Sequence, residues 1–239
     1  MKKITIILFV FSALLLSNEC LGQKSNTDKK YTFKRGDDNG IGKWYMEREI
    51  AYVMGYQGID WLERSEREKE ENVSNLIQNM GIKSNDIIAD IGAGSGYHVF
   101  RMAPLAEKGL IYAVDIQGEM LMAIEKSKES FKIRNIETIL GSEKSVNLPK
   151  NSVDKILMVD VYHEFNFPVE MIASIKNVLK PNGQIFLIEY RGEDSKVPIK
   201  KIHKMTEKQA VREMEAAGFK LKENIANLPW QHCMVFAKK

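Results

Sequence analysis

Cysteine is scarce in this chain: Cys20 and Cys233 are the only two among its 239 residues. Cleavage of an N-terminal leader after Gly22 would leave Cys233 alone, so no disulfide could form within the mature chain. The sequence therefore predicts a fold stabilised by its hydrophobic core. Cys233, expected on the last strand, is predicted to be a small core residue.

The chain also lacks a strong excess of charge of either sign. It has 35 basic and 32 acidic residues, which gives a net charge of +3. Because these residues are interspersed, they predict an ordinary solvated surface and argue against nucleic acid as a partner. Internal repeats and low-complexity tracts are absent as well. The length and the 44% hydrophobic content predict one domain with one core.

Long hydrophobic runs are confined to residues 4–16, a stretch too short to span a bilayer comfortably. Lys2 and Lys3 precede it, so residues 1–22 are interpreted as a signal peptide cleaved after Gly22. This interpretation predicts export to the periplasm and no integral membrane span in the mature chain. Two alternatives stay open: a lipid anchor on Cys20, although Glu19 fits such a site poorly, and an uncleaved anchor.

Residues 23–80 are predicted to be a linker followed by an N-terminal helical extension. The first eight are polar and suit a flexible tether, residues 37–40 have turn chemistry, and residues 60–80 have a helical pattern. Trp44, Tyr45 and Tyr52 form a dense aromatic group. These aromatic residues are expected either to pack against the domain or to cover its ligand.

Residues 81–239 alternate between strand and helix patterns. Strands are predicted at 86–91, 110–114, 136–140, 153–159, 184–190, 221–225 and 233–236, and helices at 97–107, 119–131, 169–179 and 206–217. Residues 180–183 are predicted to be a turn. This order predicts an α/β fold with a mostly parallel seven-stranded sheet, covered on both faces, and a C-terminal antiparallel hairpin.

A glycine-rich turn between the first strand and the first helix is the strongest motif. It follows Asp90 and consists of Gly92, Ala93, Gly94, Ser95 and Gly96. Such a turn lets the backbone approach a nucleotide-like ligand, because glycine has no Cβ, while the free N–H groups of the helix face the same place. A dinucleotide fingerprint needs a glycine three residues after Gly94, and that position is Tyr97.

Polar residues follow the other strands of the predicted sheet. Ligands of such sheets bind at the carboxyl ends of the strands, so these residues are the candidates for a site. Asp115 ends the second strand, where a carboxylate can accept hydrogen bonds from both hydroxyls of a ribose. The remaining candidates are Ser142 and Glu143 after the third strand, Asp160, Tyr162, His163 and Glu164 after the fourth, and Glu189, Tyr190 and Arg191 after the fifth.

The motifs IADIGAGSGY, AVDIQGEML, SVDKILMVDVYHEF and LKPNGQIFLIEYRGED occur in this order. This series resembles the motifs of class I S-adenosylmethionine (SAM)-dependent methyltransferases, over residues 86–239. The leader GKWYMEREIAYVMGYQGIDWLER and the segment VPIKKIHKMTE resemble exported bacterial proteins of this family whose substrate is unassigned. The resemblance implies a Rossmann-like class I methyltransferase fold and SAM as the cofactor.

By this resemblance, Asp90 and residues 92–96 surround the amino-acid end of SAM. Asp115 is expected to bind the ribose and Ile116 to lie beside the adenine, while Ser142 and Glu143 stand where the family often has an adenine-binding Asp. Asp160 is assigned to the cofactor site as well. A second interpretation of Asp115, as an N-cap of the following helix, stays open.

His163 and Glu164 are the candidate catalytic residues, because a base helps when the methyl acceptor carries a proton. An equally weighted interpretation makes them a packed helix start and a cap. Tyr162, Glu189, Tyr190 and Arg191 are the candidate substrate-binding residues. Asp160, His163 and Glu164 offer too few ligands for a metal site, with no further His nearby in sequence, and His203 is expected in a solvated loop.

The predicted function is SAM-dependent methyl transfer to a small molecule. No cysteine lies near the strand ends, which argues against arsenite methylation, and the fourth strand does not end in the N-P-P-Y motif of amino-methylating nucleic-acid enzymes. Two alternatives remain: an exported protein that binds SAM or a nucleoside without catalysis, and an NAD-dependent oxidoreductase, which Tyr97 disfavours.

Overall fold

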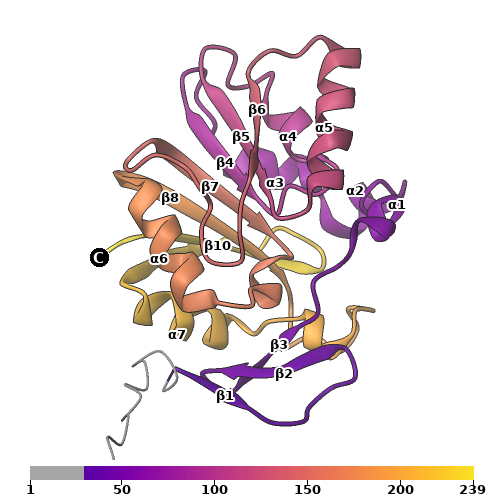
Figure 1. The fold of residues 1–239 in the computed structure, drawn as a ribbon, viewed down its shortest axis with the longest axis vertical. Helices are drawn as coiled ribbons and strands as arrows, with labels where there is room; N and C mark the ends of the chain where they lie inside the picture. Colours follow the sequence, from indigo (N-terminus) through magenta and orange to yellow (C-terminus); the bar gives the residue numbers. More distant parts are fainter. Residues whose placement is uncertain (1–29) are drawn as a thin grey trace, which may run out of the picture.

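The fold is an α/β sandwich built on one large sheet, and the computed structural model describes residues 30–239 of the chain (Figure 1). The predicted signal peptide, its cleavage site and Cys20 lie outside the described residues. Seven strands run in the order β6-β5-β4-β7-β8-β10-β9. Their bounds are β4 (Ile87–Ile91), β5 (Leu110–Asp115), β6 (Ile136–Leu140), β7 (Val153–Val159), β8 (Leu179–Tyr190), β9 (Phe219–Asn224) and β10 (Gln231–Lys238).

The predicted sheet is confirmed. Strands β6, β5, β4, β7 and β8 pair in parallel, whereas β10 runs antiparallel to both β8 and β9. The chain leaves β4 toward β5 and β6, and then returns to add β7 and β8 on the other side. The order therefore reverses beside β4, and a crevice forms at such a switch point.

Helices cover both faces of this sheet, as predicted. One core cluster includes Ile88 and Leu157, packed with residues of the first group of helices, and the other includes Ala89 and Ile156, packed with residues of the second group. Neighbouring strand residues thus face opposite sides, and both sides are apolar, as a buried parallel sheet requires. The first group is α3 (Val73–Asn79), α4 (Val99–Met102) and α5 (Gly118–Phe131), and the second is α6 (Pro168–Val178) and α7 (Glu207–Ala216).

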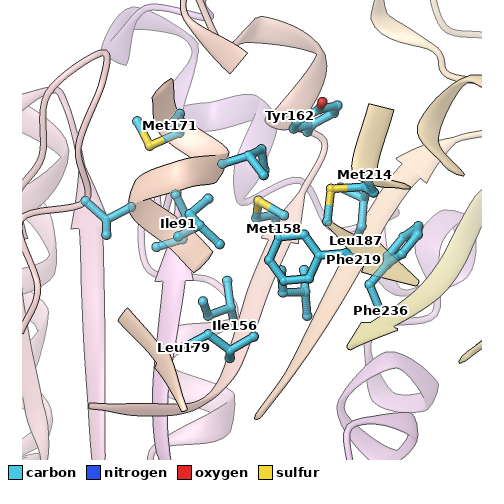
Figure 2. Close-up of a cluster of buried hydrophobic side chains, with 14 of the residues drawn as sticks. Ile91, Ile156, Met158, Tyr162, Met171, Leu179, Leu187, Met214, Phe219 and Phe236 are labelled. Carbon is cyan, nitrogen blue, oxygen red and sulfur yellow. The ribbon is translucent and has the colours of Figure 1, made fainter. Parts of the chain in front are cut away.

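Figure 2 shows the core on the α6 and α7 side of the sheet. Met171 and Met214 come from the two helices and pack over strand residues such as Ile156 and Leu187. Phe219 and Phe236, fully buried, close the cluster at the antiparallel edge. Cys233 lies buried on β10 in the opposite cluster, which confirms its predicted core position.

The N-terminal extension differs from the prediction. Ahead of the helices lies a three-stranded antiparallel sheet, drawn at the bottom of Figure 1. Its hairpin turn consists of Met46 and Glu47 with φ of 47° and 69°. The sequence hid this hairpin because such turns usually carry Asn or Gly, which tolerate positive φ. The strands are β1 (Tyr31–Phe33), β2 (Gly40–Tyr45) and β3 (Arg48–Ala51).

The helix predicted at residues 60–80 is broken into α1 (Ile59–Leu62), α2 (Arg67–Glu71) and α3. Asn72 adopts φ 52° and ends α2, and its side chain accepts a hydrogen bond from Asn75 N, at 3.1 Å, at the start of α3. A single asparagine thus serves as the last residue of one helix and the N-cap of the next. Periodicity alone does not reveal such a break.

The bounds of one helix and one strand also differ from the prediction. Helix α4 spans only Val99–Met102 of the predicted 97–107, and Pro104 follows it. Strand β8 begins at Leu179, so the predicted turn at 180–183 is instead an irregularity in the ladder, between the pairs Val153↔Leu179 and Lys155↔Gln184. Among the described residues no helix is long and apolar enough to cross a membrane.

A buried ion pair attaches the small sheet to α7. Arg48 Nε lies 2.8 Å from Glu213 Oε1, with side-chain exposures of 10% and 0%. Glu213 Oε2 accepts further hydrogen bonds from Arg48 Nη2 and from the Tyr162 hydroxyl, at 2.9 and 2.8 Å. Losing one partner of such a pair leaves an uncompensated buried charge.

We expect Glu213→Gln to lower the free energy of unfolding by about 3–5 kcal/mol, because Arg48 keeps its buried charge and loses its counter-charge. Urea unfolding followed by circular dichroism measures this change. Glu47→Gln is the matched control. Glu47 pairs with Arg212, which lies on α7 beside Glu213, but the Glu47 side chain is 86% exposed. Equal midpoints for the two variants would contradict the importance of the buried pair.

Candidate functional site

A cavity of about 390 Å³ lies at the carboxyl ends of the parallel strands. The ends of β4, β5, β7 and β8 contribute to its wall through Gly92, Asp115, Asp160 and Tyr190. This is the crevice expected where the strand order reverses. The structure therefore brings most of the predicted strand-end residues together.

The glycine turn is shaped by positive φ angles and close packing. Gly92, Gly94 and Gly96 have φ of 75°, 54° and 86°. A Cβ on Gly92 would lie 2.5 Å from Val161, and one on Gly94 would lie 2.7 Å from Leu62. The turn thus leaves no space for side chains at these two positions, and it presents its backbone to the cavity.

Asp115 ends β5 and supports this turn. Its Oδ2 accepts a hydrogen bond from Gly94 N and its Oδ1 one from Gln117 N, both at 2.9 Å. The residue is buried yet lines the cavity, and burial raises the pKa of its carboxyl. Gln117 directly precedes helix α5, so the hydrogen bond from Gln117 N agrees with a structural role for Asp115 at the start of that helix. Because Asp115 also lines the cavity, a ligand-binding role is compatible with the same position.

Asp90 and Asp160 are buried carboxylates at the ends of the neighbouring strands β4 and β7. Asp90 Oδ2 and Asp160 Oδ1 have no hydrogen-bond partner among the described residues. Burial raises the pKa of Asp90 to about 7 and that of Asp160 well above its ordinary range. Unsatisfied buried acceptors are rare in native proteins, and a cationic or hydrogen-bond-donating ligand would satisfy them.

Arginines near these carboxylates are already paired. Arg64 and Arg67 line the cavity and both bond Glu71, which also accepts a hydrogen bond from the Tyr190 hydroxyl at 2.8 Å. Asp160 Oδ2 accepts its one hydrogen bond from Gln231, at 2.6 Å. The sequence predicted no role for Arg64, Arg67 or Gln231, because only the folded chain places them beside the strand ends.

The expected adenine side of the cavity is more open. Ser142 and Glu143 line it and are exposed, and Ile116 lines it with 40% of its surface exposed. Ala93 and Ser95 are buried in the turn, and the Ser95 hydroxyl donates to Glu63. Seven of the predicted cofactor residues line the cavity: Gly92, Gly94, Asp115, Ile116, Ser142, Glu143 and Asp160. The other four, Asp90, Ala93, Ser95 and Gly96, are buried around the turn and do not line it.

Two predicted substrate residues point elsewhere. Tyr162 directs its hydroxyl to Glu213, behind the sheet end, and Arg191 donates to the carbonyl oxygen of Pro229 at 2.7 Å. Neither lines the cavity. Tyr190 does line it, whereas Glu189 is fully buried behind His163.

His163 and Glu164 face the cavity from the short 3-10 helix η2 (Tyr162–Glu164). His163 Nδ1 lies 2.7 Å from Glu189 Oε2, and its Nε2 lies 3.1 Å from Nδ1 of His203. Burial lowers the pKa of His163 and the Glu189 carboxylate raises it, with a net increase. Burial raises the pKa of Glu164 to about 7. His203, predicted to be a solvated loop residue, thus belongs to this cluster.

A segment ahead of the domain covers the cavity. We call residues 53–64 the cover segment; its Val53, Met54, Trp61, Leu62 and Arg64 line the cavity. Tyr56 N donates to Gln117 Oε1, at 2.8 Å, and Gln117 Nε2 donates to Met54 O, at 3.0 Å. Of the aromatic residues weighed from the sequence, Tyr45 packs in the small sheet and Tyr52 is exposed, so the covering role belongs to their neighbours.

These residues fit SAM as judged from the chain alone. The glycine turn offers backbone to a bulky ligand, Asp115 offers carboxylate oxygens, and the orphaned oxygens of Asp90 and Asp160 suit the ammonium group of an amino-acid tail. A buried carboxylate is stabilised by such a cation. The donor and acceptor pattern therefore agrees with the cofactor expected from the sequence.

Comparison with known proteins supports the same family. Residues 82–232 match the family model described as a methyltransferase domain. An uncharacterized methyltransferase-like protein of Schizosaccharomyces pombe is 33% identical over 124 residues, 52% of this chain and 46% of that protein. The ubiquinone/menaquinone biosynthesis C-methyltransferase UbiE of Wigglesworthia glossinidia brevipalpis is 31% identical over 105 residues, 43% of this chain and 42% of that protein.

The chain thus spans under half the length of these two curated relatives. Among solved structures, a SAM-dependent methyltransferase from Aquifex aeolicus superposes with a TM-score of 0.73 at 22% identity. The match covers 77% of this chain and 98% of that one. It confirms the predicted Rossmann-like methyltransferase fold.

We expect Gln117→Ala to loosen the cover segment, because Gln117 makes one hydrogen bond to Tyr56 N and one to Met54 O. At about 1 kcal/mol for each bond, the Tyr56 amide should exchange with solvent roughly 10-fold faster or more, which NMR-detected hydrogen exchange measures. Glu119→Ala, an exposed position on the same helix, should leave the rate unchanged. Equal rates in both variants would refute this anchoring.

We expect Asp90→Asn to stabilise the ligand-free protein at pH 8. The folded-state pKa is raised from 3.8 to about 7, so the wild type loses stability as the pH rises through this window, by an amount on the order of 4 kcal/mol. Chemical unfolding at pH 4 and pH 8 measures the difference in free energy of unfolding between Asp90→Asn and the wild type, and this difference should vanish at pH 4. Asp154→Asn should act in the opposite direction. Burial raises the pKa of Asp154, but the hydrogen bonds from Lys180 and Ile87 N, together with the charges of Lys180 and Lys155, lower it overall.

Proposed function

The chain belongs to the methyltransferase domain family, and from this premise we propose that it transfers a methyl group from SAM to a small-molecule acceptor. One observation carries the proposal. Three buried carboxylates, Asp90, Asp115 and Asp160, end neighbouring strands around the glycine turn, and two of them have an oxygen without a partner among the described residues. A nucleoside with a cationic amino-acid tail supplies the missing partners.

The residues divide the cavity into two halves. Asp115 would hold the ribose, Ile116 and Ser142 would lie toward the adenine, and Asp90 and Asp160 would hold the amino-acid tail. His163, Glu164 and His203 line the other half. When bound, SAM supplies a sulfonium-activated methyl group, so the chain has to align the acceptor with that group and exclude water.

The His163 side of the cavity is where the acceptor's proton would leave. His163 is held by Glu189 through Nδ1, which leaves Nε2 toward the cavity. Because a carboxylate accepts the Nδ1–H hydrogen, the lone pair of the neutral ring is placed on Nε2. Glu164 stands beside it, with 3.8 Å between His163 Nε2 and Glu164 Oε1.

A small acceptor is favoured over a macromolecule by the cover segment, which encloses the cavity and is hydrogen-bonded to Gln117 and Glu164. The balanced charge of the chain, +3, gives no reason to expect nucleic acid. The NAD-dependent alternative is disfavoured by the family. A protein that binds SAM without catalysis remains an outcome of the test, and export through residues 1–22 remains part of the proposal.

The test is calorimetric titration of the full chain with SAM and with S-adenosylhomocysteine, followed by an acceptor screen that detects S-adenosylhomocysteine. We expect saturable binding of both ligands. Asp115→Ala should weaken SAM binding at least about 100-fold, because two hydrogen bonds to a charged acceptor contribute about 1.5–3 kcal/mol each.

Asp154→Ala is the matched control, since Asp154 lies at the opposite end of the sheet, where it bonds Ile87 N and Lys180. A second pair of variants tests the glycine turn. In Gly94→Ala the residue has a φ of +54° and the added Cβ would lie 2.7 Å from Leu62, whereas in Gly118→Ala, the control, the added Cβ would meet no atom within 4 Å. Asp115→Ala and Gly94→Ala should lose SAM binding, whereas the two control variants should keep it. If neither SAM nor its product binds wild type, the proposed function is wrong; binding without turnover would favour the non-catalytic alternative.

A further inference from the structure

Two histidines and a glutamate from separate parts of the chain meet at the cavity wall. His163 and Glu164 come from η2, and His203 from η3 (Lys201–His203). His163 Nε2 lies 3.1 Å from His203 Nδ1, and Glu164 Oε1 lies 3.8 Å from each of these nitrogens. All three side chains line the cavity. Such a set of ligand atoms can hold a metal ion.

Other contacts aim these three atoms at one another. Glu189 Oε2 holds Nδ1 of His163 at 2.7 Å, so only Nε2 faces the group. Met54 N donates to Glu164 Oε2 at 3.2 Å, so Oε1 is the oxygen turned inward. A carboxylate that fixes the far nitrogen of a histidine is the usual support of a metal ligand, because it sets the tautomer and the ring orientation.

The charges around His163, Glu164 and His203 favour the binding of a cation. Glu164 and Glu189 contribute two buried carboxylates. The Arg48 guanidinium, which donates to the carbonyl oxygen of His163 at 3.0 Å, is paired with Glu213, and Lys200 donates its Nζ to Asn39. With both imidazoles neutral, a divalent ion would balance the two carboxylates. In its absence, the short distance between the two rings is explained by a proton shared by Nε2 and Nδ1.

The distances suit a small ion. Metal–ligand bonds of about 2.1 Å would subtend about 95° across the 3.1 Å edge and about 130° across the two 3.8 Å edges. The three angles sum to about 355°, so the ion would lie close to the plane of the three atoms, and a tetrahedral site needs the two longer edges to shorten to about 3.4 Å. The cavity side remains open for a further ligand, as in catalytic sites with three protein ligands.

We propose that His163 Nε2, Glu164 Oε1 and His203 Nδ1 bind a divalent first-row transition-metal ion, with Glu189 as the positioning residue for His163. Two imidazoles and one carboxylate select this class of ion over Mg²⁺ and Ca²⁺. This site is not apparent in the sequence, because His203 follows His163 by 40 residues and joins it through the packing of η3 on η2.

The role of the ion rests on the proposed function. A hydroxyl of the acceptor would take the open position, where the ion lowers its pKa. With the ion on Nε2 of His163, that nitrogen no longer accepts a proton, so the proton of the acceptor would go to solvent. An oxygen lone pair would form the bond to the methyl carbon, and the bond between that carbon and the sulfonium would break with its electron pair left on sulfur. No oxidant or reductant is needed.

The test is metal titration of the full chain, freed of metal by chelation and carrying no polyhistidine tag, without SAM. We expect Zn²⁺ to bind at one ion per chain by calorimetry, and Co²⁺ to give visible absorption bands that Zn²⁺ removes. His203→Gln, at a half-buried position, should weaken Zn²⁺ binding at least about 100-fold, more than the loss usual for an outer-shell residue.

His232→Gln is the matched control. His232 pairs with Glu193 at 2.9 Å but has no third metal-ligating partner among the described residues, so its affinity for Zn²⁺ should stay within about 2-fold of wild type. Circular dichroism melting checks the fold of both variants. Absence of saturable binding in the wild type, or equal affinity in His203→Gln, would overturn the metal site. Calorimetry with SAM is independent of this result, so a failed metal site and a failed methyltransferase proposal remain distinguishable.

Discussion

Three acidic side chains buried side by side are the constraint around which this molecule is built. Asp115, Asp90 and Asp160 lie at the carboxyl ends of β5, β4 and β7, which are neighbours in the sheet. Backbone N–H groups satisfy both oxygens of Asp115, whereas within residues 30–239 the other two residues each keep one unpartnered oxygen. Buried carboxylates without partners cost stability, so the ligand-free fold maintains them at the expense of its own stability. That pattern is typical of a site shaped for a ligand.

The extension ahead of the domain covers one side of this arrangement, while the side lined by Ser142 and Glu143 stays exposed. Arg48, bonded to Glu213, fixes the small sheet against α7, and the chain then passes over the strand ends as the cover segment. Ser95 of the glycine turn donates to Glu63 of that segment, and Met54 N donates to Glu164. The cover therefore contacts both halves of the cavity. These few hydrogen bonds hold the cover segment over the cavity, while the buried pair of Arg48 and Glu213 keeps the extension attached.

The sequence predicted the parts that local patterns encode. Alternation of strands and helices, Asp90 before the glycine turn and Asp115 at a strand end depend on neighbours in the chain, and the structure confirms the fold and these positions. The sequence did not predict the hairpin turn at Met46 and Glu47, because these residues match no turn motif. It also did not predict the break at Asn72, which lies inside a helical pattern. Contacts between distant segments were also inaccessible: Arg67 beside Asp90 and His203 beside His163 require the folded chain.

The difference between the two halves of the cavity follows from how each is built. The half lined by the predicted cofactor residues consists of strand ends and a glycine turn, whose positions are fixed by the ladder of the parallel sheet. The other half consists of the short segments η2 and η3 and the cover segment, which are held by side chains such as Glu189 and Gln117. Substitutions in those segments can alter the acceptor side without disturbing the sheet. Under the proposed function, we therefore expect the residues around His163, Glu164 and His203 to decide which acceptor fits, whereas the family resemblance is carried by the strand ends.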